Sequence, residues 1–342
     1  MRLEDIVRRI IKRGKDSDII IDDISINQAK KLLHEGYESL LQDDLENAKE
    51  LYLQVLELDP NDSRALNNLG YILQEYGFKN ASLNLYNQVV ELNNDEKSVS
   101  LSIGNKGSIA LDSGKIEEAE KYYKKALDVN PKNASAYHNS ALILSKERNN
   151  MKEAEKYYEK ALDLYAEDKF KSSLLSDWGF DYLELGDKSR SEKLLRKAIA
   201  LNPSNSMALS NFGSLRYEQG KNEEAEKLWG EVIRINNSRD ALAYAYNNLG
   251  YLYKENGKNE DAILNFLSSI EVCPSYKIEY EKVQKLIYKG LQECFEKMGC
   301  VRDVISIMKD YFTHNKSKEA GTFVLSLLDY VGDNRAEDEV WQ

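Results

Sequence analysis

The stretches NNLGYILQEYG (residues 67–77) and NNLGYLYKENG (residues 247–257) are near copies of one another, although they lie far apart in the chain. A second type of stretch recurs as well: EEAEKYYKKAL (117–127), KEAEKYYEKAL (152–162) and EEAEKLWGEVI (223–233). The two types alternate along the sequence, and self-similarity of this kind is the signature of a repeat architecture. We therefore expect consecutive copies of one helical hairpin, each packed on its neighbours.

Regular spacing defines each copy. In five copies, two glycines stand seven residues apart: Gly70 and Gly77, Gly107 and Gly114, Gly179 and Gly186, Gly213 and Gly220, and Gly250 and Gly257. In two further copies, Gly36 and Ala141 take the place of the first glycine. The second glycine of a pair predicts a left-handed residue that closes the first helix. The first glycine predicts a point where two antiparallel helices cross closely.

Three further positions support the hairpin. A small residue stands twelve positions after the first glycine, as at Ala119 and Ala225, and a bulky residue sixteen positions after it, as at Tyr86 and Trp229. The four prolines, Pro60, Pro131, Pro203 and Pro274, each stand 24 positions after a first-glycine place, where they would end the second helix. Successive first-glycine places are 34, 37, 34, 38, 34 and 37 residues apart, so we expect extra residues near Lys97, Lys169 and Asp240.

This pattern resembles the tetratricopeptide repeat (TPR) family over about residues 29–318. The resemblance implies an all-α fold, a right-handed α-α superhelix (solenoid) of TPR helical hairpins, with seven clear units and one degenerate unit in which Gln292 replaces a glycine. Residues 1–28 would form an N-terminal amphipathic helix (about Leu3 to Arg13) and a lead-in, and residues 319–342 a capping helix and an acidic tail. The last helix would begin near Ser317. The basic N-terminal helix either caps the array or touches acidic lipid or nucleic acid.

Composition and charge argue against several classes of function. The net charge of −11 argues against nucleic acid as the main partner and against an anionic membrane surface. Cys273, Cys294 and Cys300 have neither disulfide-framework nor zinc-site spacing, so we expect no metal and a cytoplasmic protein. No apolar run is long enough for membrane insertion. With three scattered histidines and no nucleophile or phosphate-loop motif, we expect no catalytic residues, no cofactor and no enzyme activity.

In the TPR family the first helices line a concave groove that takes an extended peptide or a helix of a partner. The candidate binding residues stand two places before the first glycine, namely His34, Asn68, Asn105, Asn139, Asp177, Asn211 and Asn248, and one place after it, namely Tyr37, Tyr71, Phe180 and Tyr251. An asparagine amide offers a donor and an acceptor, so a ladder of amides suits an extended backbone. Against this, Asn-Leu-Gly is common in ordinary TPR repeats, and such tyrosines are more often packing residues.

The sequence thus predicts a non-enzymatic scaffold or adaptor for a protein or peptide partner. Two alternatives stay open: a peptide-pheromone-type sensor, and a non-catalytic subunit that positions another enzyme. Only about 28 residues precede the first repeat, which is short for the output domain that such sensors carry. Self-association through the degenerate C-terminal repeat also stays open.

Overall fold

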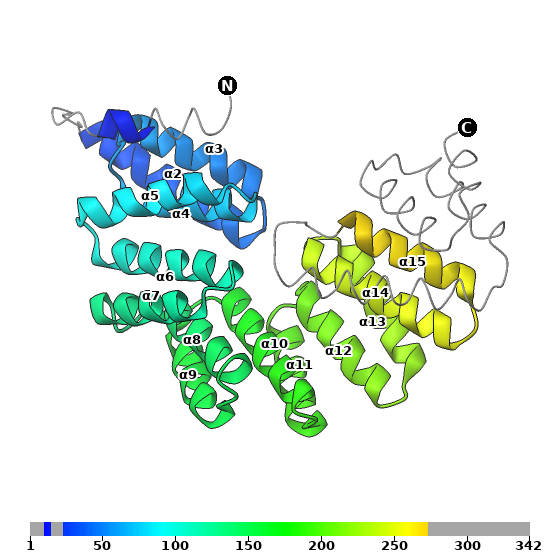
Figure 1. Cartoon of the computed structure of the whole chain (residues 1–342). Helices are drawn as coiled ribbons and strands as arrows, with labels where there is room; N and C mark the ends of the chain where they lie inside the picture. Colours follow the sequence, from blue (N-terminus) through cyan, green and yellow to red (C-terminus); the bar gives the residue numbers. More distant parts are fainter. Residues whose placement is uncertain (1–9, 15–22, 273–342) are drawn as a thin grey trace, which may run out of the picture. The chain divides into compact units, whose positions relative to one another are not determined.

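The computed structural model describes residues 10–14 and 23–272, and all regular secondary structure in these ranges is helical (Figure 1). The helices are α2 (Asp23–Leu41), α3 (Leu45–Leu58), α4 (Ser63–Glu75), α5 (Lys79–Leu92), α6 (Glu96–Asp112), α7 (Ile116–Val129), α8 (Ala134–Lys146), α9 (Met151–Leu164), α10 (Asp168–Glu184), α11 (Lys188–Leu201), α12 (Ser206–Glu218), α13 (Asn222–Ile235), α14 (Arg239–Glu255) and α15 (Asn259–Val272). Each even-numbered helix, from here on a first helix, turns back into the following odd-numbered second helix, so the described chain is a solenoid of hairpins. It divides into two compact units, Met1–Leu174 and Leu175–Gln342, with the boundary inside α10.

The hairpins are held by the close crossing that the spacing predicts. A Cβ atom on Gly70 would lie 2.6 Å from Cε1 of Tyr86, and a Cβ atom on Gly179 would lie 2.9 Å from Cγ of Leu195. The small residues of the second helices are fully buried, each 0% exposed: Ala48, Ser82, Ala119, Ala154, Ser191, Ala225 and Ala262. The bulky side chain sixteen places after the first glycine lies against that glycine, which leaves room for a ring.

The turn between the two helices also follows the prediction. Gly77 has a φ of +82° and Gly114 a φ of +71°, both in the left-handed region. Two hairpins reach the same conformation without glycine, through Asp43 (φ +62°) and Asn149 (φ +49°). Asparagine and aspartate adopt this region more readily than other non-glycine residues. Spacing based on glycine alone misses them.

The connections between hairpins explain the uneven repeat length. Helices α3, α7 and α11 are each followed by an extended residue and then by proline, whereas α5 and α13 end at left-handed Asn93 and Asn236. Helices α6, α10 and α14 have 17 residues each, compared with 13 in α4, α8 and α12. The extra residues expected near Lys97, Lys169 and Asp240 therefore add about one helical turn.

Neighbouring hairpins also meet through their first helices, because α4 contacts α6, α6 contacts α8, and α12 contacts α14. Before the first hairpin, Ile10 and Ile11 pack against the core of the first unit, and Asn61 Nδ2 donates to the Gly14 carbonyl at 3.0 Å. The rest of the expected N-terminal helix, the degenerate eighth unit, the expected C-terminal helix and the three cysteines lie outside the described residues.

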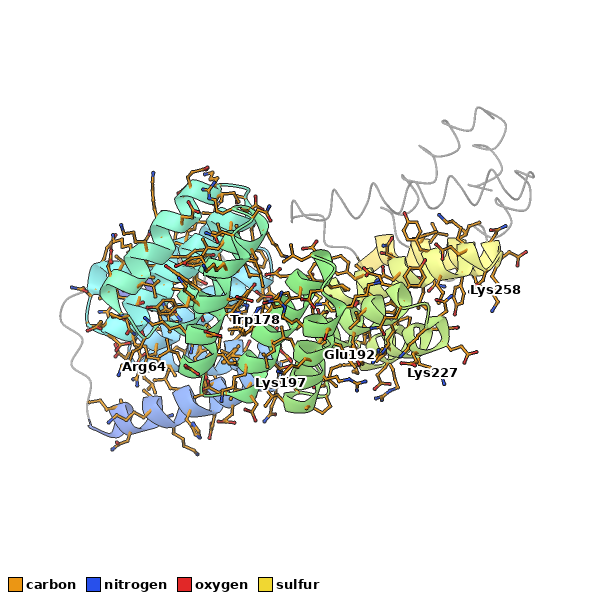
Figure 2. All side chains as sticks on the ribbon, turned by 90° about the horizontal axis from the view of Figure 1, so that it is seen from below. Arg64, Trp178, Glu192, Lys197, Lys227 and Lys258 are labelled. Atoms are coloured by element: carbon orange, nitrogen blue, oxygen red, sulfur yellow. The ribbon has the colours of Figure 1, made fainter. Side chains whose placement is uncertain are left out.

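An ion pair between a half-buried carboxylate and a buried guanidinium joins α11 to α12 in the second unit. Arg216 is 3% exposed, and its Nη2 lies 2.9 Å from Oε1 of Glu192 (labelled in Figure 2). The same guanidinium stacks on the ring of Phe212, 4.4 Å from its centroid. Hydrogen bonds from Arg216 lower the pKa of Glu192 to about 2. The single carboxylate of α11 is therefore held ionised by Arg216.

Replacing either of two glycines in α6 by alanine tests the close crossing, because the two substitutions should change the free energy of unfolding in opposite directions. In Gly107→Ala the new methyl would lie 2.7 Å from Cε1 of fully buried Tyr123, so we expect a loss of roughly 1–3 kcal/mol in the free energy of unfolding. In Gly104→Ala the nearest atom is 3.7 Å away, so better helix propensity should add about 0.5–1 kcal/mol. Urea denaturation followed by circular dichroism measures both, and equal effects of the two variants would refute the crossing.

The Glu192–Arg216 pair predicts a pH dependence. The pKa of Glu192 falls from 4.5 to about 2 in the folded chain, so its stabilisation is complete above about pH 4.5 and is lost as the pH falls toward 2. Because Glu192 is partly exposed, we expect a loss of roughly 1 kcal/mol between about pH 6 and pH 3. Thermal melts of Glu192→Gln should lack this share of the acid dependence, whereas Glu231→Gln on exposed α13 should retain it.

Candidate functional site

All eleven candidate binding residues lie on first helices. They are His34 and Tyr37 on α2, Asn68 and Tyr71 on α4, Asn105 on α6, Asn139 on α8, Asp177 and Phe180 on α10, Asn211 on α12, and Asn248 and Tyr251 on α14. His34 and Tyr71 are exposed, Asn211 is buried, and the others are half-buried. We call the side of the first helices that carries these residues the first-helix face, and each unit has its own.

In the first unit, the asparagine amides reach back to the preceding hairpin. Nδ2 of Asn68 lies 3.0 Å from the hydroxyl of Tyr52, and Nδ2 of Asn139 lies 3.2 Å from Oγ of Ser108. Nδ2 of Asn105 donates to Oδ1 of Asn67 at 3.2 Å. The amide donors thus help to join one hairpin to the next.

The second unit repeats this arrangement. Asn211 donates to Oγ of Ser176 at 3.1 Å, and Asn248 donates to Oγ of Ser214 at 3.2 Å. The sequence pattern predicts that both halves of each amide meet a partner, but the donor half is used within the chain. Within residues 23–272, no hydrogen bond from another group reaches Oδ1 of four of these amides, namely Asn105, Asn139, Asn211 and Asn248.

Sequence reasoning missed the acceptors of this ladder. Ser108 and Ser214 occupy the place after the first glycine, where other hairpins carry Tyr37, Tyr71 or Tyr251. A serine there receives the amide of the following hairpin, as Ser108 receives Asn139. The presence of serine in place of an aromatic residue at Ser108 and Ser214 was the available signal.

The aromatic residues of the face differ in their surroundings. Tyr251 packs edge-on against Phe266 with ring centroids 5.2 Å apart, and Lys254 Nζ lies 4.5 Å from the centroid of its ring. Tyr71 is 40% exposed. The negative charge of Glu75, then burial and the charge of Asp43, raise the pKa of Tyr71 well above its ordinary value. Tyr71 therefore has a partly exposed ring and a neutral hydroxyl that is buried beside carboxylates.

Tyr37 is engaged by a contact that no local pattern predicts. Its hydroxyl donates to Oε1 of Glu167 at 2.6 Å, a residue 130 positions later. Beside it, Nζ of Lys169 lies 2.9 Å and 3.1 Å from the carbonyl oxygens of Leu40 and Leu41 and 2.6 Å from Oδ1 of Asp43. We call these interactions the clasp.

The clasp places a positive charge at the C-terminal end of α2 and connects that end to another helix. The last turn of α2 contains no basic residue, so its terminal carbonyls lack the positive charge that favours a helix C-terminus. Lys169 supplies that charge from the extra turn of α10. The C-terminal end of α2 is thus tied to the start of α10 within the first unit, and Tyr37 is less available to a partner than Tyr71.

Other kinds of site find no support in the part of the chain that the structure describes. No group of three or more His, Cys, Asp or Glu residues there is arranged to hold a metal ion. Buried His138 lies among aromatic rings, 6.0 Å from Tyr158 and 6.2 Å from Tyr165 between centroids. No described helix has the length and apolar character needed to cross a membrane.

Comparison with known protein families identifies the same repeats that the structure shows. Tetratricopeptide repeat models match residues 32–62, 51–82, 98–167, 177–241 and 243–276, which together cover more than half of the chain. No curated protein matches the sequence significantly.

Solved structures show the same fold at low sequence identity. The APC/C hetero-tetramer Cut9–Hcn1 contains a chain 17% identical, with a TM-score of 0.63; the match covers 99% of this chain but only 58% of that one. A human IFIT1 dimer with PPP-AAAA is 18% identical, with a TM-score of 0.62 and coverage of 97% and 78%. A tetratricopeptide repeat protein from Parabacteroides merdae ATCC 43184 is 19% identical, with a TM-score of 0.51 and coverage of 79% and 99%. At these identities the likeness concerns the fold alone.

The clasp can be tested on the chain by itself. Lys169→Met removes the charge that caps α2, so we expect roughly 1–2 kcal/mol less protection of the α2 amides against hydrogen exchange. Lys171→Met is the matched control, since Lys171 lies on the same turn and its one ion pair within the described residues is with Asp168, at 3.9 Å. Equal exchange at the end of α2 in both variants would show that the clasp contributes nothing.

Proposed function

The chain belongs to the tetratricopeptide repeat family, and we propose that it is a non-enzymatic scaffold that binds an extended peptide or a helical segment of a partner protein on its first-helix face. TPR hairpins and a solenoid fold are generally associated with protein interaction rather than with catalysis. The choice of this face rests on the candidate residues, all of which lie on first helices.

The amide acceptors carry the proposal. Their donor halves already bond within the chain, so each amide is held in one orientation, as Asn139 is held by Ser108. A fixed carbonyl acceptor suits the N–H groups of an extended backbone and costs little further ordering when it binds. Tyr71 adds exposed aromatic surface beside the ladder. Such a face would bind the main chain of the partner and would discriminate little between its side chains.

The alternative functions that the sequence leaves open differ in the kind of ligand that each would bind. A pheromone-type sensor would prefer one short peptide sequence, whereas a scaffold would take a segment of a larger protein. A non-catalytic subunit of an enzyme would bind its partner on this same face and would change that partner's activity. A cytoplasmic location and self-association through the C-terminal repeat stay predictions.

Substituting the ladder should separate binding from folding. We expect Asn105→Ala combined with Asn139→Ala to weaken peptide binding by about tenfold or more, at a cost of roughly 1–2 kcal/mol in stability from two lost inter-hairpin hydrogen bonds. Binding is measured on an array of immobilised 15-residue peptides and then by fluorescence anisotropy with the peptides that bind.

The matched control carries the same change on a second helix. Asn84 and Asn87 of α5 are exposed and lie off the first-helix face, so Asn84→Ala with Asn87→Ala should bind as the wild type does. Wild-type affinity in the ladder variant would place the partner elsewhere on the array.

A further inference from the structure

The clasp closes the first unit into a ring of helices. Helices α2 to α8 are connected in order, since α2 packs on α3, α3 on α4, α4 on α6, and α6 on α8. Tyr165 continues the ring, because its hydroxyl lies 3.3 Å from Oγ of Ser135 on α8 and its aromatic ring stacks on Phe170 of α10, with centroids 5.6 Å apart. Lys169 of α10 then returns to the end of α2. The first helices of this unit therefore form a closed series instead of an open row.

The closing contacts lie on the first-helix face itself. Tyr37, whose hydroxyl donates to Glu167, is a residue of that face. Asp43, the other carboxylate of the clasp, is close to the second tyrosine of the face in this unit. The charge of Glu75, then burial and the charge of Asp43, raise the pKa of Tyr71. The clasp thus borders both tyrosines that a partner of this unit would meet.

The closed clasp leaves no side entrance between the two helix ends that it joins. Its donor and acceptor atoms are 2.6 Å to 3.1 Å apart, whereas a helix with its side chains is about 10 Å across. The ladder amides Asn105 and Asn139 lie on α6 and α8, which are helices of the same ring. A partner segment cannot pass between the end of α2 and the start of α10 to reach them while the clasp is formed.

The clasp is also a contact that can open. Its interactions are polar, and the side chains of Asp43 and Lys169 are 51% and 25% exposed. Among the described residues, the apolar core cluster that includes Leu33 of α2 contains no residue of α10. Water can replace the hydrogen bonds of the clasp, so its opening exposes little apolar surface. Closed and open states that differ by a few polar contacts are suited to a switch.

We propose that the clasp is an autoinhibitory latch: it holds the first-helix face of the first unit closed, and a partner segment reaches the ladder amides of α6 and α8 only when the clasp opens. This inference rests on the function proposed above, because it concerns the regulation of the same face. A clasp that only stabilises α2 would leave the binding of a partner unchanged. The two roles therefore differ in a binding measurement.

The test opens the clasp in the full chain. Glu167→Ala with Lys169→Met removes both residues that reach α2 from the side of α10, and neither is a candidate binding residue. Wild type and variant are both screened on the array of immobilised 15-residue peptides, and the peptides that bind are followed by stopped-flow anisotropy. The variant should bind with a dissociation constant lower by about fivefold or more, mainly through faster association, because its open state no longer has to be selected. In the wild type, saturating peptide should speed hydrogen exchange at the end of α2.

The matched control is Asp168→Ala with Lys171→Met, which removes an acid and a lysine from the same turn without touching α2. It should bind as the wild type does. Unchanged or weaker binding after the clasp is opened would overturn the latch and leave the first-helix face as the proposed site. Adding Asn105→Ala and Asn139→Ala should cancel the gain, and a gain that persists would overturn the latch because the peptide then binds elsewhere. If no peptide binds to either the wild type or the opened variant, both proposals fail.

Discussion

The contact between a glycine on the first helix and a bulky side chain on the following second helix, present in six of the described hairpins, is the constraint on which the array depends. At Gly213 there is no room for a methyl group, because a Cβ atom would lie 2.5 Å from Nε1 of Trp229. The helices therefore approach closely enough to bury large rings at the centre of a two-helix unit that has little other core. The same contact fixes which face of each first helix points away from the hairpin.

Several of these rings also connect neighbouring hairpins. Tyr52 lies against Gly36 in its own hairpin, and its hydroxyl receives the amide of Asn68 in the next. Tyr123 lies against Gly107 and is hydrogen-bonded to Ser108, which in turn receives Asn139. Packing and the amide ladder are therefore one system. The residues proposed to meet a partner are positioned by the residues that hold the stack together.

Much of the fold follows from the sequence, because its determinants are local and repeated. The glycine pairs predict the crossing and the turn, and the spacing near Lys97 predicts extra residues, which lengthen α6. The ladder could be placed on one face by periodicity, but the direction of each amide could not, since it depends on Ser108 and Ser176 across a hairpin boundary. The clasp could not be predicted at all. Nothing in the spacing relates Lys169 to Leu40, which lies 129 positions earlier and in another hairpin.

That separation changes how the first unit should unfold. In an array whose hairpins touch only their neighbours, stability is a sum of adjacent terms, and the end hairpin frays first. The hydrogen bond from Tyr37 to Glu167 adds a contact of very long range to this linear scheme. Detaching α2 then also breaks contacts at the start of α10, so the end of the array gains cooperativity with its middle. The same contact also affects the order of folding. It can form only after the large loop between Tyr37 and Glu167 has closed, so we expect it to form late.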